Sequence, residues 1–188
     1  MKNLVEPIKN KSDIEKIENY LKLHNKRNRL IFVFGINTGL RVSDILGLNV
    51  EDVEKKSYIE IKEKKTGKYK RFPLNKKLKE LIKDYLKTVR VNQYSITNDN
   101  PLFVGKHHCR LDRSQVYRFL NDTCRKLGIT ANIGTHTMRK SFGYHFYKKY
   151  NDIALLQKIL NHSSPAITLR YIGIEQDEID LSYNNFEL

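Results

Sequence analysis

The sequence lacks the features that mark membrane proteins and disulfide-rich proteins. No apolar run approaches the ~20 residues that a membrane-spanning helix needs. The opening segment MKNLVEPIKNK has no apolar core of the kind found in secretory signal peptides. Cysteine occurs only at Cys109 and Cys124, which excludes a disulfide scaffold. We therefore expect a cytoplasmic protein with no disulfide and no membrane contact.

A zinc site is also not expected. His107 and His108 stand next to Cys109, but the spacing of this group to Cys124 matches no zinc finger or zinc ribbon pattern. The sequence therefore predicts no bound metal.

Acidic residues are scarce compared with basic ones. The chain has 35 Lys and Arg against 21 Asp and Glu, which gives a formal net charge of +14. The basic residues are spread along the chain, whereas residues 175–188 contain several acids and no Lys or Arg. A polyanion such as DNA is the expected partner of so basic a body.

The length of 188 residues suits one domain with one core. Apolar periodicity predicts helices over residues 12–23, 27–37, 75–90, 112–127, 135–150 and 153–160. Ser12 with Glu15 would form a capping box at the first of them, and Asp112 with Gln115 would open the fourth. Ser164 would cap a further helix with Pro165 at its first position, and that helix would carry Tyr171. Between Ser57 and Pro73 the pattern changes to β, with Lys64–Lys68 as a hairpin tip. We predict an α+β fold that is mostly α, with a small antiparallel β-sheet at one edge.

Polar residues with catalytic potential gather between Thr135 and Tyr171, in THTMRKSFGYHFYKKYNDIALLQKILNHSSPAITLRY. His136 and Arg139 open one predicted helix, and His162 follows the next one. Attack on a phosphodiester needs a nucleophile, donors to the charged oxygens and a group that transfers protons. A Tyr hydroxyl, an Arg fork and His rings can supply these three functions. Each residue alone has an ordinary structural explanation, but a phosphoryl-transfer site explains the whole set.

The order and spacing of these motifs resemble the catalytic domain of the tyrosine recombinases, the phage-integrase group of site-specific DNA recombinases. HTMR, LNH and LRY stand where that family has His-x-x-Arg, Leu-Gly-His and its Tyr. TGLRVSDILGL supplies the upstream Arg41 with Asp44, and KKTGKYKRFPL supplies Lys65 on the hairpin. The resemblance runs from Ser12 to Ile174. Asn161 replaces the usual Gly at a helix end that favours a left-handed residue.

The resemblance implies a role for each of the main side chains. Tyr171 would attack a DNA phosphate, leaving a 3′-phosphotyrosyl bond and a free 5′ hydroxyl. Arg41 and Arg139 would hold the phosphate, and His162 would donate a hydrogen bond to it. His136 would assist as a base or a donor. Rejoining would require neither a metal nor another cofactor, because the phosphotyrosyl bond retains the energy of the cleaved bond.

The resemblance also assigns the hairpin lysine and the surroundings of the site. Lys65 precedes Thr-Gly as the family's residue does and would protonate the leaving oxygen, with Lys64 and Lys68 as alternatives. Asp44 is expected to support the upstream Arg, and Lys140 replaces a His that is common in the family. Contacts to the DNA backbone are predicted for Lys64, Lys68, Arg113, Arg118 and Lys140.

The expected domain organisation is a lead-in over residues 1–11, the catalytic domain over residues 12–174 and an acidic, apolar tail over residues 175–188. In relatives the tail packs onto a neighbouring protomer. Here it would dock on another protomer, or dock on its own protomer and lower activity without a partner. We therefore expect a homo-oligomer, a tetramer, on double-stranded DNA and a monomer without it. Most relatives also carry an N-terminal helical domain that closes around DNA, so efficient recombination is expected to need another subunit or such a domain.

Two other functions fit the same residues. A type IB topoisomerase-like enzyme would nick and rejoin DNA with the same Arg, Lys, His and Tyr chemistry but without a specific target. A catalytically inactive DNA-binding module would keep only the fold, and the intact Arg41, Arg139, His162 and Tyr171 argue against it. Strand exchange between two sites would indicate a recombinase, and relaxation of supercoils alone would indicate a topoisomerase.

Overall fold

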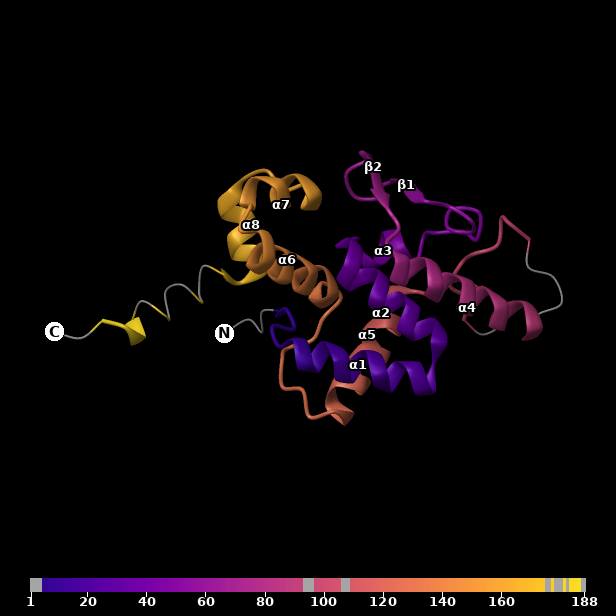
Figure 1. The fold of residues 1–188 in the computed structure, drawn as a ribbon, viewed down its shortest axis with the longest axis horizontal. Helices are drawn as coiled ribbons and strands as arrows, with labels where there is room; N and C mark the ends of the chain where they lie inside the picture. Colours follow the sequence, from indigo (N-terminus) through magenta and orange to yellow (C-terminus); the bar gives the residue numbers. More distant parts are fainter. Residues whose placement is uncertain are drawn as a thin grey trace.

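Helices make up most of the fold, and one β-hairpin projects from it (Figure 1). The computed structural model describes residues 5–92, 97–105, 109–174, 177, 181 and 183–186. The helices are α1 (Lys11–His24), α2 (Lys26–Thr38), α3 (Val42–Ile45), α4 (Lys76–Asn92), α5 (Arg113–Lys126), α6 (Thr137–Tyr150), α7 (Ile153–Leu160) and α8 (Pro165–Ile172). Strands β1 (Tyr58–Lys62) and β2 (Tyr69–Pro73) form an antiparallel sheet. The predicted mostly α fold with a small antiparallel sheet is confirmed.

The main core surrounds α2, which is apolar on all sides. Phe32, Val33 and Phe34 are fully buried, because α1, α4 and α6 all pack against this helix. A helix that is apolar on all sides is stable only when other elements cover every side of it. α2 ends at Gly39, which adopts a left-handed conformation with φ 63°. The chain therefore turns at a fixed place, just before Arg41.

α6, α7 and α8 form a second, smaller apolar cluster in which Leu156, Leu160 and Ile172 are fully buried. Gly143 allows α6 and α8 to approach closely, since a Cβ at this position would lie 2.6 Å from Cγ2 of Ile172. Ile172 directly follows Tyr171 in α8. The packing of these two helices therefore sets the position of that tyrosine.

Several predicted helix ends are confirmed. Asp112 and Gln115 form the capping box of α5. Asn161 ends α7 in the left-handed conformation with φ 54°. Ser164 caps α8, and Pro165 occupies its first turn. These ends follow from local side-chain chemistry, which is why the sequence predicts them.

The start of α1 differs from its prediction. The side chain of Asn10 accepts the capping hydrogen bond from the N–H of Ser12, so the predicted capping box of Ser12 with Glu15 is wrong. Asn caps helices as well as Ser does. The position of Asn10 is set by the packing of the residues before it. Ile8 is buried there, and its N–H donates to Ser141 of α6 at 2.8 Å. The described part of the lead-in is thus packed against the body.

The hairpin has the predicted position and tip. Ile59 pairs with Phe72, and Ile61 pairs with Lys70. The N–H of Gly67 donates to the carbonyl of Glu63 at 2.8 Å, which closes the turn over Lys64–Lys68. Gly67 takes a left-handed conformation with φ 68°, so a side chain there would be strained.

The two cysteines are free: Cys109 is exposed and Cys124 is buried. His107 and His108 lie outside the described residues. Among the residues that the structure describes, no three His, Cys, Asp or Glu side chains gather in a way that could hold a metal ion. No helix in this described part is both long enough and apolar enough to span a membrane.

Candidate active site

The structure brings most of the predicted catalytic side chains together from distant parts of the chain. Nδ1 of His136 lies 3.2 Å from the hydroxyl of Tyr171, and the ring centroids of His162 and Tyr171 are 4.9 Å apart. Arg41 and Arg139 are close enough for their charges to lower the pKa of both histidines. These residues come from the start of α3, the start of α6, the α7–α8 turn and α8 (Figure 1).

Arg139 is buried and joins the ends of two helices. Its guanidinium donates to the carbonyl oxygens of Gly39, at the end of α2, and of Leu160, at the end of α7. Helix C-termini carry partial negative charge, which a cation stabilises. Gly39 stands two residues before Arg41, and Leu160 stands two residues before His162. Arg139 therefore fixes the places from which both of those side chains reach the site.

Two buried carboxylates surround Arg41. Its Nη1 lies 2.9 Å from Oε2 of Glu63 and 3.9 Å from Oδ2 of Asp44. The predicted partner Asp44 is thus present, but Glu63 is nearer. Burial by itself would raise the pKa of Glu63, but the hydrogen bond from Thr66 and the positive charge of Arg41 together lower it. Glu63 is therefore a carboxylate that orients Arg41, and sequence analysis missed it because it stands in a run of charged hairpin residues.

Tyr171 is partly buried, and its hydroxyl is held in the protonated form. Burial raises the pKa of Tyr171, and the charges of Arg139 and Arg41 offset only part of that rise. Nζ of Lys140 lies 5.1 Å from the centroid of the tyrosine ring. A phenol with a raised pKa attacks poorly unless a base accepts its proton. If Tyr171 is the nucleophile, the site must therefore supply a base.

His136 occupies the position that such a base requires. It is the residue before α6, and its Nδ1 faces the hydroxyl of Tyr171. The side chain of His136 is partly exposed and partly buried. Burial lowers the pKa of His136, and the charges of Arg139 and Lys140 lower it further. The ring is therefore neutral near pH 7, and Nδ1 can accept the hydrogen of the tyrosine.

His162 is neutral and is oriented by Thr168. Burial and the charge of Arg139 lower the pKa of His162 to about 4. Nδ1 of His162 lies 3.1 Å from the hydroxyl of Thr168, which donates its hydrogen to the carbonyl of Ser164 at 3.0 Å. A hydroxyl has a single hydrogen, so Nδ1 of His162 must be the donor in this pair. Nε2 then carries a lone pair and can donate to a phosphate only after it takes up a proton.

The hairpin lysines occupy different positions. Lys65 is exposed, and its charge helps to lower the pKa of His136, which places it on the side of the site. Lys64 is also exposed. Lys68 donates from Nζ to Oδ1 of Asn161 at 3.1 Å. Lys65 is thus within electrostatic reach of the site, and its choice over the two alternatives stays a prediction.

Lys70 is a cation that the sequence analysis missed. Its Nζ donates to the carbonyl of Ile159 at 2.9 Å. Burial lowers the pKa of Lys70 to about 8, and the charge of Arg139 acts in the same direction. In the register of the hairpin, Lys70 lies opposite Ile61, a partly buried core contact. Side chains of β2 alternate between an exposed face and a partly buried face, and Lys70 is on the partly buried one. This alternation is the signal that could have identified Lys70.

The predicted DNA contacts outside the hairpin fall into two groups. Arg113 and Arg118 are exposed on α5, and none of the contacts described for them reaches the residues around Tyr171. Lys140 is buried beside the ring of Tyr171. It therefore lies inside the site instead of on an open basic face, and DNA contacts by these three residues stay predictions.

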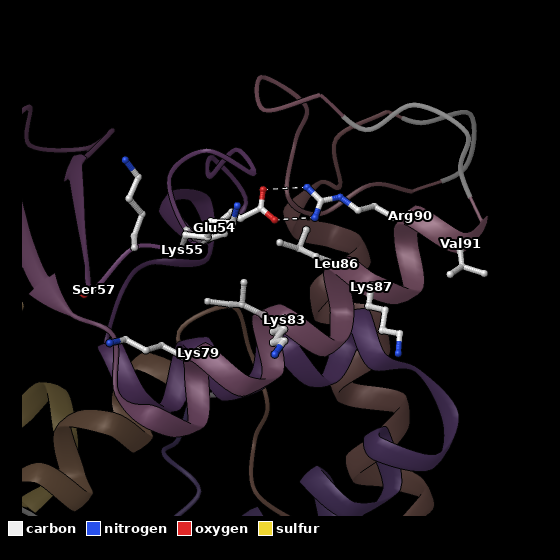
Figure 2. Close-up of a pocket in the computed structure, with 12 residues that line it drawn as sticks. Glu54, Lys55, Ser57, Lys79, Lys83, Leu86, Lys87, Arg90 and Val91 are labelled. Carbon is white, nitrogen blue, oxygen red and sulfur yellow. Dashed lines mark hydrogen bonds and ion pairs between the residues drawn. The ribbon is translucent and has the colours of Figure 1, made fainter.

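A separate groove lies between α4 and the segment before β1 (Figure 2). Its volume is about 740 Å³, and its lining includes the buried Ile82 and Leu86. Lys83 lines the same groove, and a bidentate ion pair between Glu54 and Arg90 joins its two sides. None of the predicted catalytic residues lines this groove, so it is distinct from the candidate active site.

The chain is similar in sequence to known recombinases. A family profile described as the phage integrase family matches residues 9–178. A protein named "Probable integrase/recombinase YoeC" from Bacillus subtilis is 42% identical, over 98% of both chains. Tyrosine recombinase XerC of Thermodesulfovibrio yellowstonii is 30% identical, over 80% of this chain and 51% of that relative. The chain thus spans nearly all of YoeC but about half of XerC.

The fold is also similar to those of solved recombinases. The crystal structure of XerA recombinase matches with a TM-score of 0.75 at 23% identity, over 98% of this chain and 68% of that one. XerH recombinase bound to a palindromic difH substrate, in a post-cleavage complex, matches with a TM-score of 0.73 at 24% identity, over 97% of this chain and 54% of that one. At these identities the likeness shows a shared fold.

Proposed function

The chain belongs to the phage integrase family of tyrosine recombinases, and on that premise we propose that it cuts and rejoins DNA at specific sites through a covalent bond to Tyr171. The observation that carries the proposal is the contact of 3.2 Å between Nδ1 of His136 and the hydroxyl of Tyr171, next to two arginines. Both the sequence relatives and the geometry support transesterification by this tyrosine.

Phosphate binding would use the cations that converge here. Nη1 of Arg41 is buried in ion-pair range of Glu63, and no hydrogen bond to a described residue engages the other guanidinium nitrogens, which would donate to a phosphate oxygen. Arg139 and Lys70 are close enough to Arg41 for its charge to contribute to the lowered pKa of each. Arginine forks suit phosphate because they donate two parallel hydrogen bonds. Glu63 and Asp44 would keep Arg41 oriented until the DNA arrives.

Strand cleavage would follow as an in-line exchange at phosphorus. The oxygen of Tyr171 forms the new bond to phosphorus, and Nδ1 of His136 accepts the proton of the hydroxyl. The bond from phosphorus to the 5′ oxygen breaks, and Lys65 supplies a proton to that oxygen. The products are a 3′-phosphotyrosyl bond and a free 5′ hydroxyl. The reverse reaction with a hydroxyl from a partner strand completes recombination, and no external energy source is required.

His162 would join the reaction only once the phosphate is bound. An anion near Nε2 favours the protonated imidazole and raises the pKa of His162 from its low value of about 4. The protonated ring then donates from Nδ1 to Thr168 and from Nε2 to a phosphate oxygen. This two-state behaviour couples the charge of His162 to the presence of substrate.

Double-stranded DNA and further copies of the chain are the proposed partners. Solved relatives include a lambda integrase dimer bound to a core site and a lambda integrase tetramer bound to a Holliday junction. A tetramer on DNA is therefore the proposed assembly of this chain. Its acidic tail offers a docking segment, since Leu181, Tyr183 and Phe186 are exposed on it. A cytoplasmic location is part of the proposal because the substrate is DNA.

The proposal is tested by the products of the reaction. Random-sequence duplexes that become covalently attached to the protein are first selected and sequenced to obtain the target. A supercoiled plasmid with two copies of the target should then give deletion or inversion products. Relaxation of the plasmid without any exchanged product would favour the topoisomerase-like alternative. Stable binding without cleavage of the target would favour the inactive module.

A further inference from the structure

The side chain of Asn161 connects the α7–α8 turn to the tip of the hairpin. Its Oδ1 accepts a hydrogen bond from Nζ of Lys68 at 3.1 Å. Its Nδ2 donates to Oε2 of Glu63 at 3.2 Å and lies 3.4 Å from Oγ1 of Thr66. One amide group therefore contacts residues on both sides of the turn that carries Lys65.

The backbone at Asn161 explains why few residue types fit this position. Its φ of 54° and ψ of 48° lie in the left-handed region, where Gly is unstrained and Asn is the next most suitable residue. Gly would satisfy the helix end equally well, but it has no side chain to reach the hairpin. The contacts to Lys68 and Glu63 are thus additional to the role of Asn161 in ending α7.

A second contact joins the same two parts of the fold. Lys70 of β2 donates to the carbonyl of Ile159 in the last turn of α7. The partial negative charge at a helix C-terminus stabilises a nearby cation, so the position of the Lys70 ammonium is favourable. The hairpin is therefore attached to the end of α7 both at its tip and along its strand. Only the contact at the tip depends on Asn161.

We propose that Asn161 is a positioning residue that latches the hairpin tip to the α7–α8 turn and so holds Lys65 beside the site before DNA binds. The proposal rests on the proposed function, because it assigns Lys65 to proton transfer. Asn161 directly precedes His162, so the latch couples the positions of the two side chains. Without it, the ion pair from Glu63 to Arg41 and the hydrogen bond from the N–H of Lys64 to Asp44 can still form, but the tip opens more often because fewer contacts hold it.

The latch is tested first in the DNA-free protein with a matched pair of variants. Asn161→Gly removes the side chain but suits the left-handed backbone. Asn151→Gly is the control, because Asn151 ends α6 with φ 50° and is exposed. Amide hydrogen exchange is measured at Lys64 and Gly67, whose N–H groups are hydrogen-bonded at the tip.

Exchange at the tip should be about tenfold faster in Asn161→Gly, as expected for the loss of one to two hydrogen bonds. It should be unchanged in Asn151→Gly. Equal exchange in all three proteins would overturn the latch.

The consequence for the reaction is measured by adduct formation in a single turnover. At saturating DNA, Asn161→Gly should form the adduct several-fold more slowly than the wild-type protein, with an unchanged Kd for DNA. Faster exchange with an unchanged rate would overturn the positioning role. Failure of the proposed function would give a different result, because the wild-type protein itself would form no adduct. The hydrogen-exchange comparison would still decide whether the latch exists.

Discussion

Nδ1 of His136 lies 3.2 Å from the hydroxyl oxygen of Tyr171. The pKa of the histidine is lowered and that of the tyrosine is raised, both mainly by burial. The proton therefore rests on the tyrosine, opposite a neutral ring that can accept it. In the proposed reaction, a phosphate bound to the arginines would make this proton transfer favourable.

Replacement of the base should slow the chemistry and leave DNA binding intact. We expect His136→Ala to reduce the rate of adduct formation by roughly 100-fold or more, the range for loss of a general base. His145→Ala is the matched control on α6, because His145 contacts the carbonyl of Ile8 instead of the site. Single-turnover assays at saturating DNA measure both. Equal rates in the two variants would show that His136 is not the base.

DNA binding should take up protons near neutral pH. The pKa of His162 is about 4 in the free protein, and a bound phosphate raises it. The complex therefore holds more protons than its separate components, and the affinity should increase as the pH falls from 7 toward 5. Calorimetric titrations in two buffers with different ionisation enthalpies report the uptake. Uptake that is as large in His162→Gln as in the wild-type protein would contradict this assignment.

Lys70→Met should slow adduct formation by about tenfold. The substitution removes a charge-assisted donor from the end of α7 and one cation from the group that would bind the phosphate. Lys62→Met is the control, since Lys62 is exposed on β1 of the same hairpin. The comparison uses single-turnover rates over a range of DNA concentrations. A loss of equal size in both variants would mean that only the general positive charge of the hairpin matters.

Close packing of α6 on α8 should control the position of Tyr171. Gly143→Ala should lower the free energy of unfolding by about 1–3 kcal/mol through overpacking against Ile172. It should also slow adduct formation, because α8 must shift. Adding Ile172→Ala removes the methyl group that clashes, so the double variant should form the adduct faster than Gly143→Ala alone. Urea unfolding and adduct rates test the two effects, and strict additivity of the substitutions would contradict the packing argument.

The sequence predicted what depends on residue type and local order. Asn161 and Ser164 end and begin helices through their own side chains, so their positions follow from capping rules. The choice of Asn10 over Ser12 as the cap of α1 was not predictable in this way. Two good caps stand two residues apart there, and the buried Ile8 that precedes them is placed by a contact with α6.

The missed site residues owe their roles to tertiary contacts. Glu63 and Lys70 stand in a highly charged hairpin, where charge usually serves solubility. Glu63 is buried because Arg41 reaches it from the end of α2, and Lys70 is partly buried because the end of α7 covers it. Neither partner is near in the sequence. Arg139 was predicted as a phosphate ligand, but its bonds to two helix ends could not be foreseen for the same reason.

The role of Tyr171 as the nucleophile is tested most directly by trapping the covalent product. The protein is incubated with nicked duplexes that carry the selected target, in the presence of a metal chelator, and the products are separated under denaturing conditions. The wild-type protein and the His145→Ala control should give a protein–DNA adduct through a 3′ phosphate, and Tyr171→Phe should give none. An adduct that persists in Tyr171→Phe, or its absence from wild-type protein that binds the target, would contradict this role.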